Sequence, residues 1–254
     1  MQPLTDTHCH LDHLEHKPLE DVLIDANNVG VKKFISIGAS RGMDSCISAT
    51  NFAKKYANVW ASIGVHPHDA GKTSLEEVSS LAGESKVVAI GETGLDFFRD
   101  WSPFEEQKKL FRASIELAKE LKKPLIIHCR DAVDETLSIL NELNAKQVGG
   151  VFHCYSGTAE FAKKLAEINF RVSLTGIITF KSAHALRSEI AQIPIEQILL
   201  ETDCPYMAPE PFRGKPAEPM HVYQIALKLA EIKNCTIEKI AEQTNKNVSE
   251  LFGI

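Results

Sequence analysis

Leu4-Thr5-Asp6-Thr7-His8-Cys9-His10 is the stretch around which the predicted fold is organised. Its first residues have the pattern of a short β-strand, Leu4–His8, and two histidines separated by one residue stand at its end. Because successive side chains of a strand point to opposite faces, we expect His8 and His10 on the same side, a few ångströms apart. Two imidazoles in this arrangement can chelate a metal ion.

Strand-like and helical segments alternate along the whole chain. The apolar, β-prone segments predict eight strands: Leu4–His8, Lys33–Ile37, Trp60–Val65, Val87–Glu92, Leu125–His128, Gly150–His153, Phe170–Leu174 and Ile198–Glu201. The amphipathic segments between them predict helices: Leu19–Val29, Asp44–Tyr56, Leu75–Leu81, Phe104–Leu121, Asp134–Leu143, Ala159–Ile168 and Ala185–Ile193. Eight strands that alternate with helices predict a parallel sheet, and at 254 residues we expect one α/β domain, a (β/α)8 TIM-type barrel over residues 1–254. Two extra C-terminal helices, about Met220–Ile232 and Ile237–Phe252, should pack on the barrel wall.

Two predicted helices have a start signal in the sequence. Ser102-Pro103-Phe104-Glu105 has the pattern of a capping box with a proline in the first turn, and Ser74-Leu75-Glu76-Glu77 has the same pattern without the proline. We therefore expect Ser74 and Ser102 to cap the helices that follow them.

The composition is that of an ordinary globular chain. Hydrophobic residues make up 44% and charged residues 24%, which argues against disorder, and no apolar run approaches the length of a membrane span. The formal net charge of −6 disfavours broad, nonspecific adhesion to nucleic acid, which depends on lysine and arginine. The first residues lack the basic and apolar regions of a signal peptide, so we expect a cytoplasmic protein with reduced cysteines and no membrane partner.

Side chains that can bind metals follow most of the predicted strands. They are His8 and His10 after the first, His66 and His68 after the third, Glu92 at the end of the fourth, His128 at the end of the fifth, His153 at the end of the sixth and Asp203 after the eighth. The carboxyl ends of barrel strands open on one face, where active sites lie, so these residues should converge. Four of these imidazoles together with the two carboxylates already exceed the needs of one tetrahedral ion and suit two divalent ions that share a carboxylate.

Six motifs make the sequence resemble the TatD family of metal-dependent deoxyribonucleases, within the amidohydrolase-like barrels. They are Asp6-Thr7-His8-Cys9-His10-Leu11-Asp12, Gly64-Val65-His66-Pro67-His68, Gly91-Glu92-Thr93-Gly94-Leu95-Asp96, His128-Cys129-Arg130, His153-Cys154-Tyr155-Ser156-Gly157 and Glu201-Thr202-Asp203-Cys204-Pro205-Tyr206. The resemblance extends from His8 to the Arg213-Gly214-Lys215 loop. Two positions depart from the family pattern: Thr93 replaces a bulky aliphatic residue, and Pro216-Ala217 replace Arg-Asn, which removes one positive charge.

The resemblance implies a deoxyribonuclease that trims single-stranded DNA from the 3′ end, with RNA as an alternative substrate. It implies that His8, His10, Glu92 and Asp203 hold one divalent cation, and that Glu92, His128 and His153 hold a second. Imidazole-rich ligation favours Zn²⁺, Mn²⁺ or Ni²⁺, whereas nucleases commonly work with Mg²⁺, so the sequence leaves the metal open. Nothing in the sequence indicates an obligate protein partner.

The chemistry of phosphodiester hydrolysis suggests roles for further residues. Two ions can bind a phosphoryl oxygen and lower the pKa of a bridging water, and Asp203, a ligand beside that water, is the expected general base. Arg130 and Arg213 suit bidentate contacts to phosphate, and Lys215 adds a point charge. We expect His66 to line the pocket and contact the substrate.

Other polar and aromatic residues stay outside the predicted site. His68 is expected only to orient its loop. Phe98, Tyr155 and Phe180 could stack on bases, but such side chains more often pack in a core or a loop.

The main alternative is a binuclear hydrolase of amide, lactone or phosphotriester bonds in small molecules. Related barrels of that kind often bridge their metals through a modified lysine at the fourth strand, where this chain has Glu92. A noncatalytic barrel that binds a partner is the other class, and it is disfavoured because competent ligands occupy all six positions. The sequence therefore favours phosphodiester hydrolysis.

Overall fold

Strands and helices alternate in the computed structural model, which describes residues 2–254. The strands are β1 (Leu4–Cys9), β2 (Val31–Gly38), β3 (Val59–Ile63), β4 (Val87–Asp96), β5 (Leu125–Arg130), β6 (Gly150–Phe152), β7 (Phe170–Leu174) and β8 (Ile198–Leu200). The α-helices are α1 (Leu19–Asn28), α2 (Met43–Lys55), α3 (Leu75–Ser79), α4 (Phe104–Leu121), α5 (Val133–Glu142), α6 (Ala159–Glu167), α7 (His184–Gln192), α8 (Val222–Lys233) and α9 (Ile237–Phe252). All the predicted segments are present, and within residues 2–254 no helix is long and apolar enough to cross a membrane.

The strands form one sheet in the order β1-β2-β3-β4-β5-β6-β7-β8. The pairs from β3 to β6, and the pair β7 and β8, are parallel. A parallel bridge between Cys9 and Cys204 connects the end of β1 to the segment after β8. This topology, with helices between the strands, confirms the predicted (β/α)8 barrel and its two C-terminal helices.

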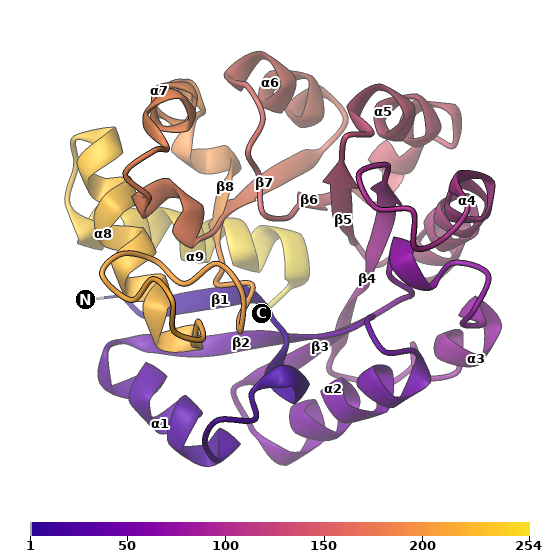
Figure 1. Cartoon of the computed structure of the whole chain (residues 1–254), viewed down its shortest axis with the longest axis horizontal. Helices are drawn as coiled ribbons and strands as arrows, with labels where there is room; N and C mark the ends of the chain where they lie inside the picture. Colours follow the sequence, from indigo (N-terminus) through magenta and orange to yellow (C-terminus); the bar gives the residue numbers. More distant parts are fainter. Residues whose placement is uncertain (1) are drawn as a thin grey trace. The chain divides into compact units, whose positions relative to one another are not determined.

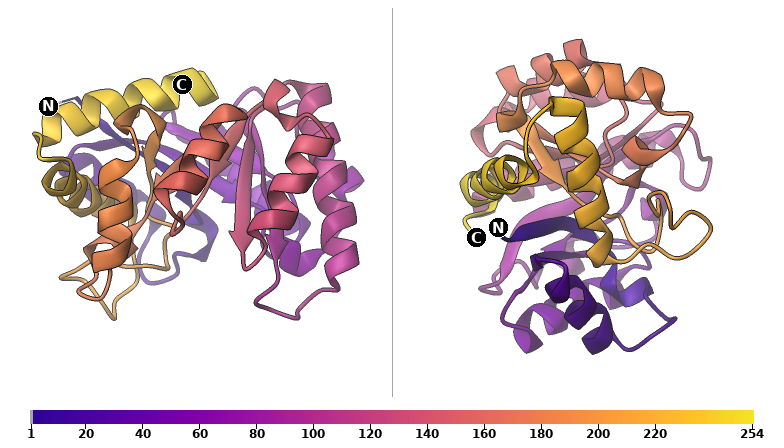
Figure 2. Two further views of the ribbon diagram at one scale, coloured as in Figure 1. Left: turned by 90° about the horizontal axis from the view of Figure 1, so that it is seen from above. Right: turned by 90° about the vertical axis from the view of Figure 1, so that its left-hand side faces the viewer.

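Among the described residues, one compact unit comprises residues 2–35, 154–167 and 171–254. In this unit α9 packs on β1 and β8, so the last helix lies beside the first strand (Figures 1 and 2). Asn247 is fully buried, and its Nδ2 donates hydrogen bonds to the carbonyls of Ile195 (2.8 Å) and Ile198 (2.7 Å). A buried amide satisfied in this way fixes α9 on the edge of β8.

The other compact unit comprises residues 36–153 and 168–170. Its helices α2, α4 and α5 pack against β3, β4 and β5 respectively. Helix α4 buries Phe111 and Ile115 completely while it exposes Glu105 and Lys109, the pattern expected of an amphipathic helix on a sheet.

The boundary between the units cuts two strands. It falls between Ile35 and Ser36 in β2 and between Phe170 and Arg171 in β7. A single domain over residues 1–254 stays a prediction.

One of the two predicted helix caps is present. The Ser74 side chain accepts a hydrogen bond from the Glu77 amide (3.3 Å), as expected of an N-cap. The prediction for Ser102 is wrong, because Pro103 occupies the N-cap position of α4. Ser102 is buried, and its hydroxyl donates instead to the carbonyl of Ala70.

Strand β4 lies unusually close to β5. Between two paired positions β4 has one more residue than β5. Ile90 pairs with Leu125 and Thr93 pairs with Ile127, so two residues of β4 lie opposite one residue of β5. A Cβ added at Gly94, where φ is +135°, would lie 2.0 Å from the carbonyl oxygen of His128. Glycine is therefore required there, and the bulge re-aims the intervening side chains, among them Glu92.

We predict that Gly94→Ala lowers the free energy of unfolding by at least about 3 kcal/mol, since it adds both a backbone clash and an unfavourable φ. Gly83→Ala is the matched control, because a Cβ there meets nothing within 4 Å, and it should change stability by no more than about 0.5 kcal/mol. Urea unfolding of both variants measures the difference. Equal stabilities would contradict the close approach of β4 to β5.

Candidate metal centre

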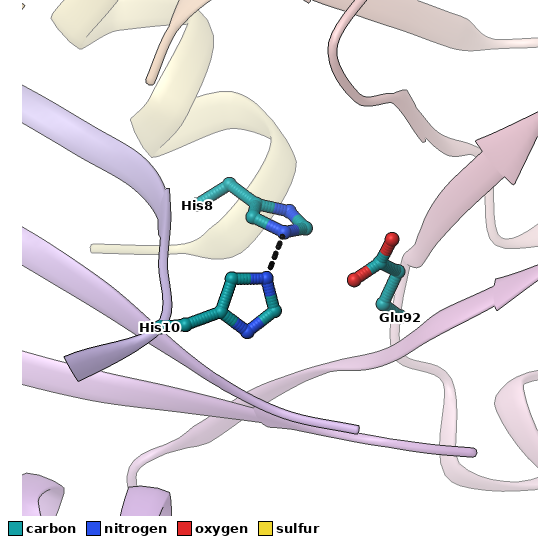
Figure 3. Close-up of side chains that lie close together, drawn as sticks. All are labelled: His8, His10 and Glu92. Carbon is teal, nitrogen blue, oxygen red and sulfur yellow. Dashed lines mark hydrogen bonds between the residues drawn. The ribbon is translucent and has the colours of Figure 1, made fainter. Parts of the chain in front are cut away.

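His8 and His10 project from the same face at the end of β1, as alternation along the strand requires. Their Nε2 atoms lie 3.3 Å apart, and the dashed line in Figure 3 joins them. Both side chains are buried. The predicted pair is therefore present.

Asp203 completes a cluster with these histidines, which we call the His8 cluster. Its Oδ1 lies 3.4 Å from His10 Nε2 and 3.7 Å from His8 Nε2. The backbone fixes this arrangement, since the Asp203 amide donates to the His8 carbonyl (2.9 Å) and the His10 amide donates to the Cys204 carbonyl (3.0 Å). Strand-like pairing thus continues beyond β1 and β8 and carries all three side chains.

Asp6 ties the same two segments together beneath the His8 cluster. Its carboxyl is fully buried and is hydrogen bonded to the Thr202 hydroxyl (2.5 Å), the Thr202 amide (3.0 Å) and the His8 amide (3.3 Å). Burial raises the pKa of Asp6 to about 8, although these hydrogen bonds oppose the rise. Asp6 was not among the site residues predicted from the sequence, although its position two residues before His8 puts it on the same strand face.

Glu92 is the centre of a second group, which we call the Glu92 cluster. Its Oε1 lies 2.8 Å from His153 Nε2, 3.0 Å from His128 Nδ1 and 3.3 Å from His66 Nε2. His128 Nδ1 and His153 Nε2 are themselves 3.3 Å apart. Strands β4, β5 and β6 and the segment after β3 therefore bring together three predicted metal ligands and the predicted substrate contact His66.

The electrostatics of the Glu92 cluster favour an ionised carboxylate. Burial disfavours the charge, but the surrounding imidazoles of His153, His66 and His128 outweigh it and hold the pKa of Glu92 well below its usual range. Burial also lowers the pKa of His66 to about 4, against the attraction of Glu92. His66 Nδ1 accepts the His68 amide (3.1 Å), so Nε2 of the neutral ring carries the proton and faces Glu92.

Asp96 is a functional candidate that the sequence analysis missed. Its buried Oδ2 lies 3.0 Å from His128 Nε2 and 2.8 Å from His68 Nε2. Burial would raise the pKa of Asp96, but hydrogen bonds from His128, the Arg99 amide and His68 lower it. A carboxylate that holds the far nitrogen of a histidine ligand fixes its ring orientation and tautomer. The available signal was spacing, since Asp96 follows Glu92 by four residues in one strand.

The spacing of the imidazoles fits metal coordination. Two nitrogens bound to one tetrahedral Zn²⁺ at about 2.0–2.1 Å lie about 3.3 Å from each other. The pairs His8/His10 and His128/His153 both have this separation, and each has a carboxylate oxygen within 3.7 Å. Each cluster thus offers the nitrogen and oxygen donors that divalent transition metals bind.

The predicted phosphate contacts lie on exposed segments. Arg130 ends β5, and its guanidinium carbon lies 3.8 Å from the centre of the Phe98 ring. Arg213 covers the Phe180 ring at the same distance, and Lys215 is exposed two residues later. The structure thus places these three cations at the surface without assigning them a ligand.

The loop that carries Arg213 and Lys215 ends at an anchored segment. Glu218 forms an ion pair with Lys17 (2.5 Å) and its Oε1 lies 2.9 Å from His16 Nε2. The Glu218 amide donates to Nδ1 of the buried His221 (3.0 Å). Burial lowers the pKa of His221 to about 4, with Glu218 opposing and Lys17 reinforcing the shift. The folded loop therefore requires a neutral His221.

Comparisons with known proteins identify relatives of this chain. The family model described as TatD related DNase matches residues 5–253. The uncharacterized metal-dependent hydrolase YabD of Bacillus subtilis (strain 168) is 41% identical over 255 residues, 99% of each chain. The 3′-5′ ssDNA/RNA exonuclease TatD of Citrobacter koseri is 35% identical over 246 residues, 94% of each chain. The crystal structure of YjjV, a TatD homologue from Escherichia coli K12, superposes with a TM-score of 0.92 at 31% identity and covers 99% of this chain and 98% of its own.

We predict a pH dependence of stability that originates at His221. In the unfolded chain this histidine takes up its proton near pH 6.5, but in the folded protein only near pH 4. The contribution of neutral His221 to the free energy of unfolding is therefore fully present above pH 6.5 and is lost as the pH falls toward 4. Between pH 7 and pH 5 the loss should reach up to about 2 kcal/mol. His221→Asn, which keeps an acceptor for the Glu218 amide, should remove this part of the slope in urea unfolding. The same slope in both proteins would refute the assignment.

Proposed function

Because the chain belongs to the TatD family of metal-dependent hydrolases, we propose that it hydrolyses the phosphodiester bonds of single-stranded DNA, or of RNA, from the 3′ end. The observation that carries the proposal is the 3.3 Å separation within each of two imidazole pairs, each beside an aspartate or glutamate. The exonuclease named among the relatives at 35% identity supports the choice of nucleic acid as substrate.

The proposed site holds two divalent cations. His8, His10 and Asp203 would hold one with Glu92, and His128 and His153 would hold the other with the same Glu92. When bound, such ions supply Lewis acidity toward a phosphoryl oxygen and lower the pKa of a water between them. The low pKa of Glu92 supports its role, because a shared ligand must be ionised. Zn²⁺, Mn²⁺, Ni²⁺ and Mg²⁺ are the candidate ions.

Asp203 is the proposed general base. Its Oδ1 is held between two imidazole nitrogens at 3.4 and 3.7 Å, and the side chain retains a small exposure to solvent. A carboxylate in this setting can take the proton of the attacking water as its oxygen bonds to phosphorus and the bond from phosphorus to the leaving oxygen breaks.

Four further residues would bind and orient the substrate. Neutral His66 would line the pocket beside Glu92 and contact the substrate or its leaving group. The exposed Arg130, Arg213 and Lys215 would contact the phosphates of the strand. We also propose that the reaction takes place in the cytoplasm.

We predict that Asp203→Asn lowers kcat on a single-stranded oligonucleotide about a thousandfold or more, because the amide cannot accept the proton. Wild-type protein treated with a chelator should lose activity and regain it with one of the four candidate ions. Asp134→Asn on the exposed face of α5 is the control and should keep wild-type turnover. Turnover of Asp203→Asn within tenfold of wild type would rule out the general-base role.

The direction of degradation is a separate prediction. A single strand labelled at its 5′ end should yield a ladder of labelled products that shorten with time, since nucleotides leave from the 3′ end. A strand labelled at the 3′ end should release labelled mononucleotide at once. Gel electrophoresis of both reactions measures this, and hydrolysis of small amides or lactones without any ladder would favour the alternative enzyme class.

A further inference from the structure

Two large aromatic side chains are exposed on the loop between β4 and α4. Phe98 retains 52% of its accessible surface and Trp101 retains 56%. The two exposed rings, three residues apart, form an apolar surface whose exposure to water does not stabilise the fold. Such exposed apolar surfaces commonly mark contact sites. Phe98 was expected to pack in a core or a loop, and its exposure excludes packing in the core.

The exposure does not result from a flexible loop, because buried side chains hold both ends of this loop. Gln107 is fully buried. Its side-chain Oε1 accepts the Asp96 amide (2.9 Å), and its Nε2 donates to the carbonyls of Asp96 (3.1 Å) and Ser102 (3.1 Å). Asp96 Oδ1 accepts the amides of Phe98 (3.0 Å) and Arg99 (2.9 Å). The rings are therefore presented by a fixed backbone.

Cations surround the two rings. The guanidinium of Arg99 lies 5.1 Å from the Phe98 ring centre and 5.3 Å from that of Trp101, and the guanidinium of Arg130 lies 3.8 Å from the Phe98 ring centre. Lys72 Nζ donates to the Trp101 carbonyl (2.8 Å). Asp100 lies in the same loop and the chain has a net charge of −6, but the groups that face the two rings are guanidiniums, which favours an anionic partner with flat, apolar parts.

The aromatic surface is connected to the Glu92 cluster by direct contacts. The rings of Trp101 and His68 meet edge to face with centres 4.5 Å apart. His68 Nε2 binds Asp96 Oδ2, and the same oxygen binds His128 Nε2. The carboxylate that anchors the loop thus also orients a proposed metal ligand, so loop and cluster keep a constant separation.

We propose that Phe98 and Trp101 form a stacking surface for unpaired nucleobases of the strand whose phosphodiester bond lies at the Glu92 cluster, with Arg99 and Arg130 facing its phosphates. The proposal rests on the proposed function. Every base has a π-face, so such a surface accepts any sequence. Bases inside a duplex are already stacked and cannot reach it, which makes the surface selective for single strands.

Fluorescence of Trp101 tests the contact without catalysis. The sequence contains two tryptophans, Trp60 and Trp101, so Trp60→Phe leaves Trp101 as the only tryptophan, which can be excited apart from the tyrosines. The metal-loaded full chain is titrated with oligothymidylate and with an abasic strand of equal length, both with phosphorothioate linkages that resist cleavage. We expect quenching by oligothymidylate and an apparent Kd at least about tenfold weaker for the abasic strand. Equal affinity for the two strands would overturn the proposal.

Steady-state kinetics provide the second test. The ratio of kcat/KM for oligothymidylate to kcat/KM for a cleavable abasic strand should fall about tenfold or more in Trp101→Ala and in Phe98→Ala. Trp101→Phe, which keeps a flat ring, should retain most of the wild-type ratio. Ile47→Ala removes a comparably exposed apolar side chain from α2, at 41% exposure, and should keep the wild-type ratio. An unchanged ratio in both alanine variants overturns the proposal.

The two proposals fail in different ways. If wild-type protein hydrolyses neither oligonucleotides nor bis(p-nitrophenyl) phosphate with any of the four ions, the proposed function is wrong, whatever the fluorescence shows. If it hydrolyses both strands with equal kcat/KM, the function stands and the stacking surface is wrong.

Discussion

The close approach of β4 to β5 is the constraint on which the Glu92 cluster depends. A Cβ at Gly91 would lie 2.6 Å from the carbonyl oxygen of Ile126, and one at Gly94 would lie 2.0 Å from that of His128. Glu92 stands between these glycines, where β4 carries its extra residue. The two strands can therefore lie close enough for the Glu92 carboxylate to reach His128 on β5 and His153, which directly follows β6.

Two buried carboxylates organise the charge in this part of the fold. One oxygen of Glu92 is surrounded by the imidazoles of His66, His128 and His153. One oxygen of Asp96 contacts His68 and His128, and its other oxygen accepts two backbone amides. Neither carboxylate could remain ionised at such burial without these partners. His128 belongs to both groups, with one ring nitrogen toward each. Its orientation is thus determined from two sides, a degree of order that a metal ligand requires.

Sequence reasoning succeeded where local pattern decides. Helices α4 and α9 have the predicted bounds, because apolar residues recur at helical spacing between clear end signals. It failed where the partner is distant in sequence. Ser102 has the local pattern of an N-cap, but a carbonyl at Ala70, 32 residues away, takes its hydroxyl. Strand β4 continues four residues beyond the predicted end at Glu92, because Gly94, Leu95 and Asp96 pair with β5. Asp96 was missed for the same reason.

By itself, the sequence determined the order of strands and helices, the barrel topology, the pairing of His8 with His10 and the ligand types at each strand end. These follow from side-chain periodicity and from the rule that parallel strands present their carboxyl ends to one edge. Only the tertiary structure decided that Glu92 lies in a bulge, that Asp96 orients His128 and His68, and that Phe98 and Trp101 are exposed on an anchored loop. The physical reason is that register shifts, shared hydrogen bonds and solvent exposure arise from contacts between segments, which no periodic pattern within one segment records.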